Sequence, residues 1–270
     1  VRLDFKGKGY QVDDDDRVPT DELLPRVSSI LDVLDRGKGL EIWKWNLGFD
    51  YVMKRLGLVC EYPRPMLFYA ISSLVKESRN AGEEVRKESS DFGSQAHYLL
   101  ERLTYNRDLP FDIKFKPVVT AWSQWLEETG LGSRIISTER SLYYYDESIK
   151  FAGTADLICR DTEENGGGLI VIDYKTSKDF HPEQVLQVGG AYTLALAYSG
   201  NQTFLNNEDM SLPMRAIVVK LPKTEDMQIE IKEIKNIPEQ QKIFKNLCEV
   251  RQWKSDKTNK WKRSLKKKNY

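Results

Sequence analysis

The feature that most constrains the fold is an apolar run that ends in two charged residues. Residues 169–175 read Leu-Ile-Val-Ile-Asp-Tyr-Lys, directly after the turn-forming sequence Asn-Gly-Gly-Gly at 165–168. Four consecutive aliphatic residues are typical of a strand in the interior of a sheet. Because side chains alternate along a strand, Asp173 and Lys175 share one face and Tyr174 points to the other. The run therefore predicts a buried strand whose end presents a carboxylate beside an ammonium group.

The preceding strand-like run, residues 150–160, carries a second carboxylate, Asp156, among apolar residues. The glycine-rich turn makes the two strands antiparallel neighbours, so Asp156 is expected close to Asp173. Two carboxylates held together repel each other unless a positive charge lies between them. Hard divalent cations such as Mg²⁺ and Mn²⁺ prefer oxygen ligands, which predicts a metal site here. The alternative is that Asp173 and Lys175 only mark the solvated end of a strand.

A metal site at this position has a definite chemistry. A bound cation lowers the pKa of a coordinated water and offsets negative charge that builds up on a phosphoryl group. Lys175, beside the metal, is suited to orient or help deprotonate that water and to stabilise the same charge.

Two upstream residues extend the predicted site. Glu139 lies on the strand-like run 135–145 and is expected to supply a third acidic group, although Glu147, in the following turn, competes for that role. Gly93 and His97 are one helical turn apart, so the glycine permits close backbone approach while the imidazole reaches past it. A lone histidine on a helix is more often structural, so the assignment of His97 depends on the acidic residues around it.

The order of predicted elements is that of a mixed α/β core preceded by helices. Residues 1–20 are expected to be irregular. Trp43 and Trp45 are two positions apart on a predicted helix and cannot share a face, so at least one is expected in a core. The predicted helices span 25–57 in two pieces, 65–87, a further helix that begins at Ser90, 118–128, 182–198 and one that starts near Pro238; the predicted strands span 135–145, 150–160, 168–175 and 214–221. We therefore expect an N-terminal helical segment at 1–88, an α/β core at 89–250 and a basic tail at 251–270.

The charge of the chain is unevenly distributed. The whole chain has 41 basic and 41 acidic residues, yet residues 251–270 hold nine Lys or Arg and one acidic residue, Asp256. A basic tail on an acidic body suits contact with a phosphate backbone. Lys262 and Arg263 are the contacts that we expect there, and a solvated, disordered tail is the alternative.

The remaining composition narrows the class of protein. Cys60, Cys159 and Cys248 are scattered and predict reduced thiols rather than a zinc or iron–sulfur site. No run approaches the roughly 20 apolar residues that a membrane span needs, and no secretory segment is present, so an intracellular protein is expected. Because the chain begins with Val1 rather than methionine, a missing upstream piece, including a cleaved targeting peptide, is compatible with the sequence.

Taken in order, these motifs resemble the RecB-type exonuclease branch of the PD-(D/E)XK nuclease superfamily. Within it, the mitochondrial genome maintenance exonuclease group and related phage exonucleases are most similar. The motifs are Gly-x-x-x-His at 93–97, Glu139, Gly-Thr-Ala-Asp at 153–156, Ile-Asp-Tyr-Lys-Thr-Ser at 172–177 and Leu-Gln followed by a tyrosine at 186–192. The resemblance implies a restriction-endonuclease-like core, that is, a mixed central sheet flanked by helices.

The resemblance also implies roles for single residues. The catalytic residues are Asp156, Asp173, Lys175 and Glu139; the metal ligands are His97, Asp156, Asp173 and the backbone carbonyl of Tyr174; Gln187 and Tyr192 steady the scissile phosphate. One departure concerns the last pair, because the family usually places its tyrosine four residues after the glutamine, and here the spacing is five. We expect Gly189-Gly190 to absorb the extra residue as a helix bulge.

The implied activity is that of a deoxyribonuclease, a phosphodiesterase that uses Mg²⁺ or Mn²⁺. By resemblance the expected substrate is single-stranded DNA with a free end, threaded beneath a helical arch and degraded during replication, repair or recombination, with proteins of those processes as possible partners. The expected compartment is a phage or bacterial cytoplasm or the mitochondrion. Two alternatives stay open: a structure-specific or duplex endonuclease of the same superfamily, and a non-catalytic DNA-binding protein on a nuclease core.

Overall fold

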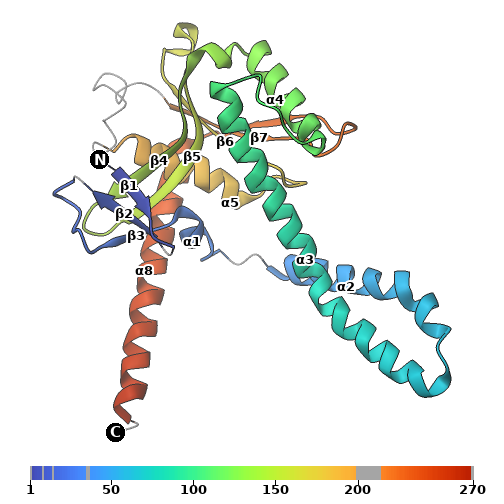
Figure 1. Cartoon of the computed structure of the whole chain (residues 1–270). Helices are drawn as coiled ribbons and strands as arrows, with labels where there is room; N and C mark the ends of the chain where they lie inside the picture. The colour runs from blue at the N-terminus through green and yellow to red at the C-terminus, as the bar shows by residue number, and fades with distance from the viewer. Residues whose placement is uncertain (1, 8, 14, 35–36, 199–213, 269–270) are drawn as a thin grey trace. The chain divides into compact units, whose positions relative to one another are not determined.

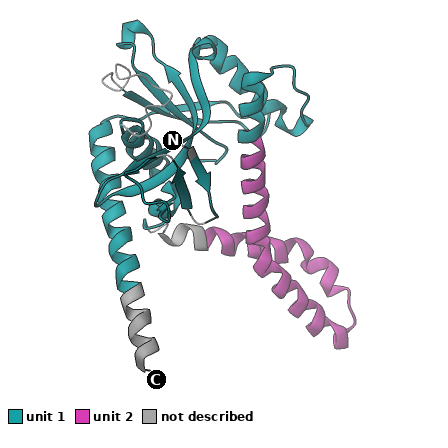
Figure 2. Cartoon of the chain, turned by 60° about the vertical axis from the view of Figure 1, so that its left-hand side comes forward, with its two compact units in different colours: residues 1–34, 97–270 teal, residues 35–96 magenta. Residues whose placement is uncertain are grey.

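The computed structural model describes the chain except for residues 1, 8, 14, 35–36, 199–213 and 269–270 (Figure 1). The side chains of residues 2, 37–41 and 259–268 are also outside the description. The chain forms two compact units, one of residues 1–34 and 97–270 and the other of residues 35–96 (Figure 2). No described helix is both long enough and apolar enough to cross a membrane.

A five-stranded mixed sheet is the centre of the larger unit. Its order is β4 (Ile135–Tyr145), β5 (Lys150–Arg160), β6 (Leu169–Lys175), β7 (Met214–Lys220) and β8 (Glu230–Glu233). Strands β6 and β7 are parallel, and the other neighbours are antiparallel. This confirms the predicted α/β fold with a mixed sheet and the predicted positions of its four longer strands. Strand β8 was not predicted, because its sequence Glu-Ile-Lys-Glu lacks an apolar pattern.

Helices flank both faces of this sheet. On β6, Leu169 and Val171 join the main apolar core together with residues of α1 (Val27–Leu31), of the segment 182–196 and of α8 (Ile237–Lys268). Tyr174 points to the opposite face, where its hydroxyl meets Trp122 of α4 (Lys116–Glu128). Helix α4 ends as predicted before Gly130, whose φ of +62° is the left-handed value typical of a helix end. Asp173 and Lys175 therefore face the core side of the sheet, where the segment 182–196 and α8 pack.

A second, small sheet corrects the expectation for the first 20 residues. They are not irregular, because β1 (Arg2–Phe5) and β2 (Gly9–Asp13) pair with each other and β3 (Leu23–Pro25) pairs with β2. Gly7, with a φ of +67°, allows the tight turn between β1 and β2. Val12 and Leu24 bury themselves against Tyr143 and Ala152 of the main sheet. The hydrophobic pattern was missed because only one face of this small sheet is covered.

The smaller unit is a pair of helices. Helix α2 (Gly37–Cys60) is followed by α3 (Arg64–Tyr105), which continues through the unit boundary to Tyr105. The prediction of two helices, with a break between Lys87 and Ser90, was wrong. The charged segment there contains neither glycine nor proline, so nothing stops the helix, and a serine begins a helix only where a break already exists. The predicted division at residue 88 thus falls inside one helix, and the division of the chain into functional domains stays a prediction.

The expectation of a buried tryptophan in this unit was also wrong. Trp43 is 38% exposed and Trp45 is 79% exposed. Two helices alone offer one shared interface, so most apolar side chains of the pair have no covering layer. That interface is close at Gly82, where an added Cβ would lie 3.3 Å from the side chain of Lys44.

The segment 182–196 changes its helical period in the middle. Its parts are α5 (Pro182–Val185), a π-helix η4 (Leu186–Tyr192) and α6 (Thr193–Leu196). A π-helix takes in one extra residue per turn, so the expected bulge at Gly189-Gly190 is confirmed. Both glycines lie against other elements, because a Cβ on Gly189 would be 2.7 Å from Ile234 and one on Gly190 would be 2.8 Å from the carbonyl oxygen of Gln240 in α8.

We predict that Gly190→Ala destabilises the protein by about 1–3 kcal/mol, because the added methyl group must displace the backbone of α8. Gly57→Ala in α2 is the matched control, since no atom lies within 4 Å of its added Cβ. Alanine favours a helix over glycine, so the control should be neutral or stabilised by about 1 kcal/mol. Urea unfolding followed by circular dichroism measures both, and equal midpoints would contradict the close packing of η4 on α8.

Candidate metal centre and active site

Three acidic residues lie in one row across the neighbouring strands β4, β5 and β6. The pairs Thr138↔Leu157 and Arg140↔Ala155 place Glu139 opposite Asp156. The β5–β6 ladder pairs Leu157 with Ile172, and one step further along both strands Asp156 faces Asp173. Residues directly opposite on neighbouring strands point to the same side of a sheet and approach closely. The predicted proximity of Asp156 and Asp173 therefore follows from the observed register.

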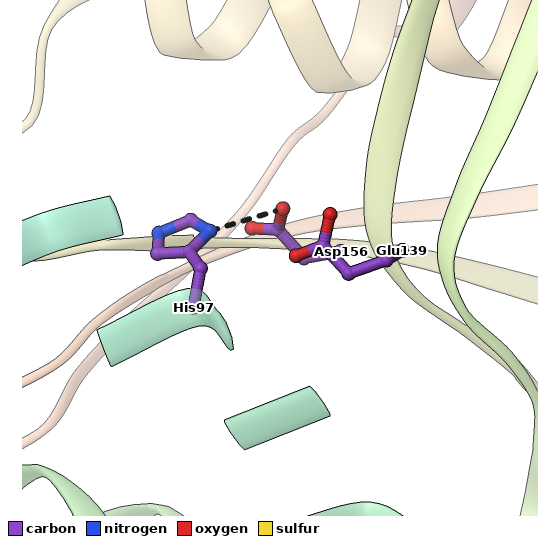
Figure 3. A group of neighbouring side chains, drawn as sticks. All are labelled: His97, Glu139 and Asp156. Atoms are coloured by element: carbon purple, nitrogen blue, oxygen red, sulfur yellow. Dashed lines mark ion pairs between the residues drawn. The ribbon is translucent and has the colours of Figure 1, made fainter. Parts of the chain in front are cut away.

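A histidine from α3 joins two of these carboxylates. His97, Glu139 and Asp156 each offer one ligand atom, and these atoms all lie within 4.8 Å of one another (Figure 3). Nδ1 of His97 is 3.2 Å from Oδ1 of Asp156. The other oxygen of Asp156 accepts a hydrogen bond of 2.6 Å from the backbone N–H of Tyr174. Both oxygens of this buried carboxylate are thus held, and its orientation is fixed.

The backbone at Glu139 is strained. Its φ is +42°, one of two positive values at non-glycine residues among those that the structure describes. The left-handed region is unfavourable for a residue with a Cβ, and Glu139 itself is skipped in the ladder between Thr138 and Arg140. Strain of this kind costs about 1–3 kcal/mol and gathers at functional sites. The strained residue is one whose carboxylate lies in the acidic group. The strain therefore supports a functional role for Glu139 rather than a role in folding alone.

Glu147, the alternative to Glu139 as the third acidic group, is exposed in the turn after β4. It does not belong to the group in Figure 3. Nζ of Lys175 lies 2.5 Å from Oδ2 of Asp173, and Asp173 is 1% exposed. From the sequence, Asp173 was expected to bind the metal with His97 and Asp156, and Glu139 was expected to be catalytic without being a ligand. The structure groups Glu139 with His97 and Asp156, and it pairs Asp173 with Lys175. Ligation by Asp173 and by the Tyr174 carbonyl stays a prediction.

Burial and mutual repulsion shift the pKa values of the cluster. Burial and then the Asp156 carboxylate raise the pKa of Glu139 to about 7, and burial raises the pKa of Asp173 to about 6 although Lys175 opposes it. Burial lowers the pKa of His97, but Asp156 outweighs this effect and raises it to about 9. Burial raises the pKa of Asp156, but His97 outweighs it, so the net shift is downward. Burial is thus the main reason why Glu139 and Asp173 hold their protons more tightly than usual, and repulsion by Asp156 adds to it.

A divalent cation fits this cluster. The donor set combines an imidazole nitrogen with carboxylate oxygens, which suits Mn²⁺ and Mg²⁺ with water in the remaining positions. Binding through Nδ1 would displace the His97 proton, since ligands bind in their deprotonated form. The positive charge of the ion would also lower the pKa of Glu139, which burial and then the Asp156 carboxylate raise. The donor atoms of this cluster therefore suit the divalent cation that was expected from the sequence.

The predicted phosphate-binding pair also comes together. Nε2 of Gln187 donates a hydrogen bond of 2.7 Å to the hydroxyl of Tyr192 across η4. The Tyr192 ring packs on Gly153 of β5, where an added Cβ would approach it to 2.9 Å. Their contact with substrate stays a prediction. Lys262 and Arg263 belong to α8 by their backbone, but their side chains lie outside the described residues.

Sequence reasoning missed the support around the cluster. Trp122 of α4 donates to the hydroxyl of Tyr174, and the hydroxyl of Tyr105 in α3 hydrogen-bonds with that of Thr138, the neighbour of Glu139. The apolar spacing of helix 118–128 signals that Trp122 is buried. It gives no sign of which strand residue the indole meets, because that depends on how α4 packs on the sheet.

The sheet and the cluster together define an α/β protein with a histidine and acidic residues gathered at one end of its strands. Residues 112–264 match the profile of the PD-(D/E)XK nuclease superfamily, and this matched segment is more than half of the chain. The chain therefore belongs to the PD-(D/E)XK nuclease superfamily. Membership implies a metal-dependent nuclease that acts on nucleic acid, and His97 lies upstream of the matched segment. The assignment to the RecB-type branch stays a prediction.

Two further comparisons add little. No curated protein matches the chain. Among solved structures, the chain is similar to one titled "Crystal structure of SSO0001", with 16% sequence identity, 65% of this chain and 67% of that chain covered, and a TM-score of 0.32. A likeness at this level supports no inference about function.

We predict that Glu139→Gln weakens the binding of Mn²⁺ by at least about tenfold, because it removes a charged ligand atom from the group. Glu147→Gln is the matched control, since it makes the same chemical change at the exposed rival position. Isothermal titration calorimetry measures both affinities. The assignment of Glu139 would be wrong if the two variants bound Mn²⁺ equally well.

Proposed function

We propose that this protein is a Mg²⁺- or Mn²⁺-dependent exonuclease that degrades single-stranded DNA from an end, in DNA replication, repair or recombination. The observation that carries the proposal is the meeting of His97, from the helix before the sheet, with Glu139 and Asp156. Among the motifs of the RecB-type branch, this histidine is the one that lies outside the sheet and its following helix. The Gln187–Tyr192 hydrogen bond supports the same branch, because it restores the pairing despite the unusual spacing.

In this proposal the chain's own residues hold the metal and orient the attack. His97, Glu139 and Asp156 would hold the cation, with Asp173 beside them. When bound, such a cation would supply an activated water and positive charge for the phosphate. Burial disfavours the charged form of Lys175, but Asp173 and Asp156 outweigh burial and raise its pKa above the usual value. The ammonium group of Lys175 would orient the water or help to deprotonate it, and would stabilise the developing charge on the phosphate.

The choice of a single strand as substrate is supported by the smaller unit and by the tail. Residues 35–96 form a helical pair that exposes aromatic side chains, among them Trp45 and Phe68 at 79% and 74%. Exposed aromatic rings stack on unpaired bases of any sequence. The basic residues of 251–270 favour a polyanion, and steering by such a segment falls with ionic strength.

We predict that Lys175→Ala lowers the rate of DNA cleavage by about 10²–10³-fold, because it removes the positive charge next to the reacting phosphate. The same variant should still bind Mn²⁺. End-labelled single strands with 5′ or 3′ blocks, closed single-stranded circles and duplexes, each with Mg²⁺ or Mn²⁺, measure activity and polarity together. Lys178→Ala, at an exposed lysine three residues further on, is the matched control and should cleave normally.

The outcomes separate the alternatives. Cleavage of closed circles would exclude a strict exonuclease, and faster cleavage of duplexes would favour an endonuclease of the same superfamily. If no substrate is cut but single strands are bound, and Lys175→Ala changes nothing, the chain is a DNA-binding protein on a nuclease core.

A further inference from the structure

One buried hydrogen bond connects α4 to the strand that carries Asp173 and Lys175. Nε1 of Trp122 lies 2.9 Å from the hydroxyl oxygen of Tyr174, and the two residues are 2% and 4% exposed. The indole N–H is a donor only, so the tyrosine oxygen accepts this bond. A buried tyrosine hydroxyl needs a polar partner, and Trp122 supplies it. The bond therefore fixes where the Tyr174 ring lies on the α4 side of the sheet.

Tyr174 in turn contacts two members of the metal cluster. Its backbone N–H donates to Oδ2 of Asp156 at 2.6 Å. Its ring meets the His97 imidazole edge-on, with the ring centres 6.2 Å apart and an angle of 81° between the ring planes. Aromatic pairs favour this arrangement, which restrains the rotation of both rings. If the Tyr174 ring moved, the His97 imidazole would thus lose the ring contact that restrains its orientation.

We propose that the side chains of Trp122 and Tyr174 are positioning residues that hold His97 and Asp156 in the geometry for cation binding. Neither side chain is in the ligand group, and Trp122 acts only through Tyr174. Groups behind metal ligands fix the direction of the ligand atoms, and their loss typically weakens metal binding by about 10–100-fold. The inference rests on the proposed cation site and goes beyond it by assigning a function to α4.

The test compares the wild type, Trp122→Phe, Tyr174→Phe and the double variant. Mn²⁺ affinity is measured by isothermal titration calorimetry on protein that circular dichroism shows to be folded, and KM and kcat for DNA cleavage are measured in parallel. Each single variant is expected to weaken Mn²⁺ binding by about tenfold or more. Because both substitutions remove the same hydrogen bond, the double variant should bind no worse than the weaker single variant. Excess Mn²⁺ should restore kcat, with KM for DNA unchanged.

Trp125→Phe is the matched control, because Trp125 lies three residues further along α4 and is 4% exposed. The same loss of volume at that position should leave Mn²⁺ affinity unchanged, even where it lowers the melting temperature. Tyr174→Phe removes a single oxygen atom and keeps the ring, so the test stands if Trp122→Phe does not fold.

The inference is overturned if both single variants bind Mn²⁺ like the wild type, if their effects add in the double variant, or if Trp125→Phe weakens binding equally. Asp156→Asn separates this failure from that of the proposed function. If the wild type binds Mn²⁺, Asp156→Asn does not bind it and Trp122→Phe binds it as tightly as the wild type, then only the positioning role is refuted. Where the wild type itself binds no Mn²⁺, the proposed cation site and the inference fall together.

Discussion

Repulsion between buried carboxylates is the constraint on which the active site depends. Glu139, Asp156 and Asp173 lie in one row across three strands, and two of them have ligand atoms within 4.8 Å. At an effective dielectric constant near 20, two like charges at such a distance cost on the order of 3 kcal/mol. A whole domain is stable by only about 5–15 kcal/mol. His97 and Lys175 offset part of this charge through their ion pairs with Asp156 and Asp173, and a divalent cation held by the cluster would offset more of it. Burial is the largest cause of the raised pKa values of Glu139 and Asp173, and the Asp156 carboxylate adds to it in both cases.

The sheet aligns the three acidic residues, and the helices add the other side chains around them. Strand register alone brings three acids to one level, because opposite residues on paired strands face the same side. The histidine comes from α3, the support for Tyr174 from α4, and the Gln187–Tyr192 pair from the segment 182–196. Helices α3 and α4 and the segment 182–196 thus each bring one or two side chains to the sheet, whose strands carry the acidic residues. Superfamily membership and this geometry agree on a metal-dependent nuclease.

Much of this arrangement was predictable from the sequence, and the exceptions have physical reasons. The runs at 135–145, 150–160 and 169–175 were found because apolar, β-branched residues between turn signals identify buried strands. His97 and Glu139 were singled out by their places on a predicted helix and strand, and their roles came from the resemblance, since a lone histidine and a lone glutamate have no local signature. The small N-terminal sheet, β8 and the unbroken course of α3 were not found, because their pairing or packing outweighs weak local preferences. The left-handed backbone of Glu139 and the contact between Trp122 and Tyr174 depend on tertiary packing, which no local pattern records.

The π-helix η4 shows how a helical segment takes in one extra residue between two side chains that stay in contact. One extra residue in a regular α-helix would turn everything beyond it by about 100° around the helix axis, since 3.6 residues make a turn. Thr193 and Leu196 would then lose their buried positions, and Tyr192 would leave Gln187. The wider π-helical turn at Gly189-Gly190 confines the extra residue to one turn of the helix, and α8 packs against this turn. The hydrogen bond between Gln187 and Tyr192 accordingly forms across five positions instead of four, and a search that demands a fixed number of residues between glutamine and tyrosine would overlook a chain that keeps this contact.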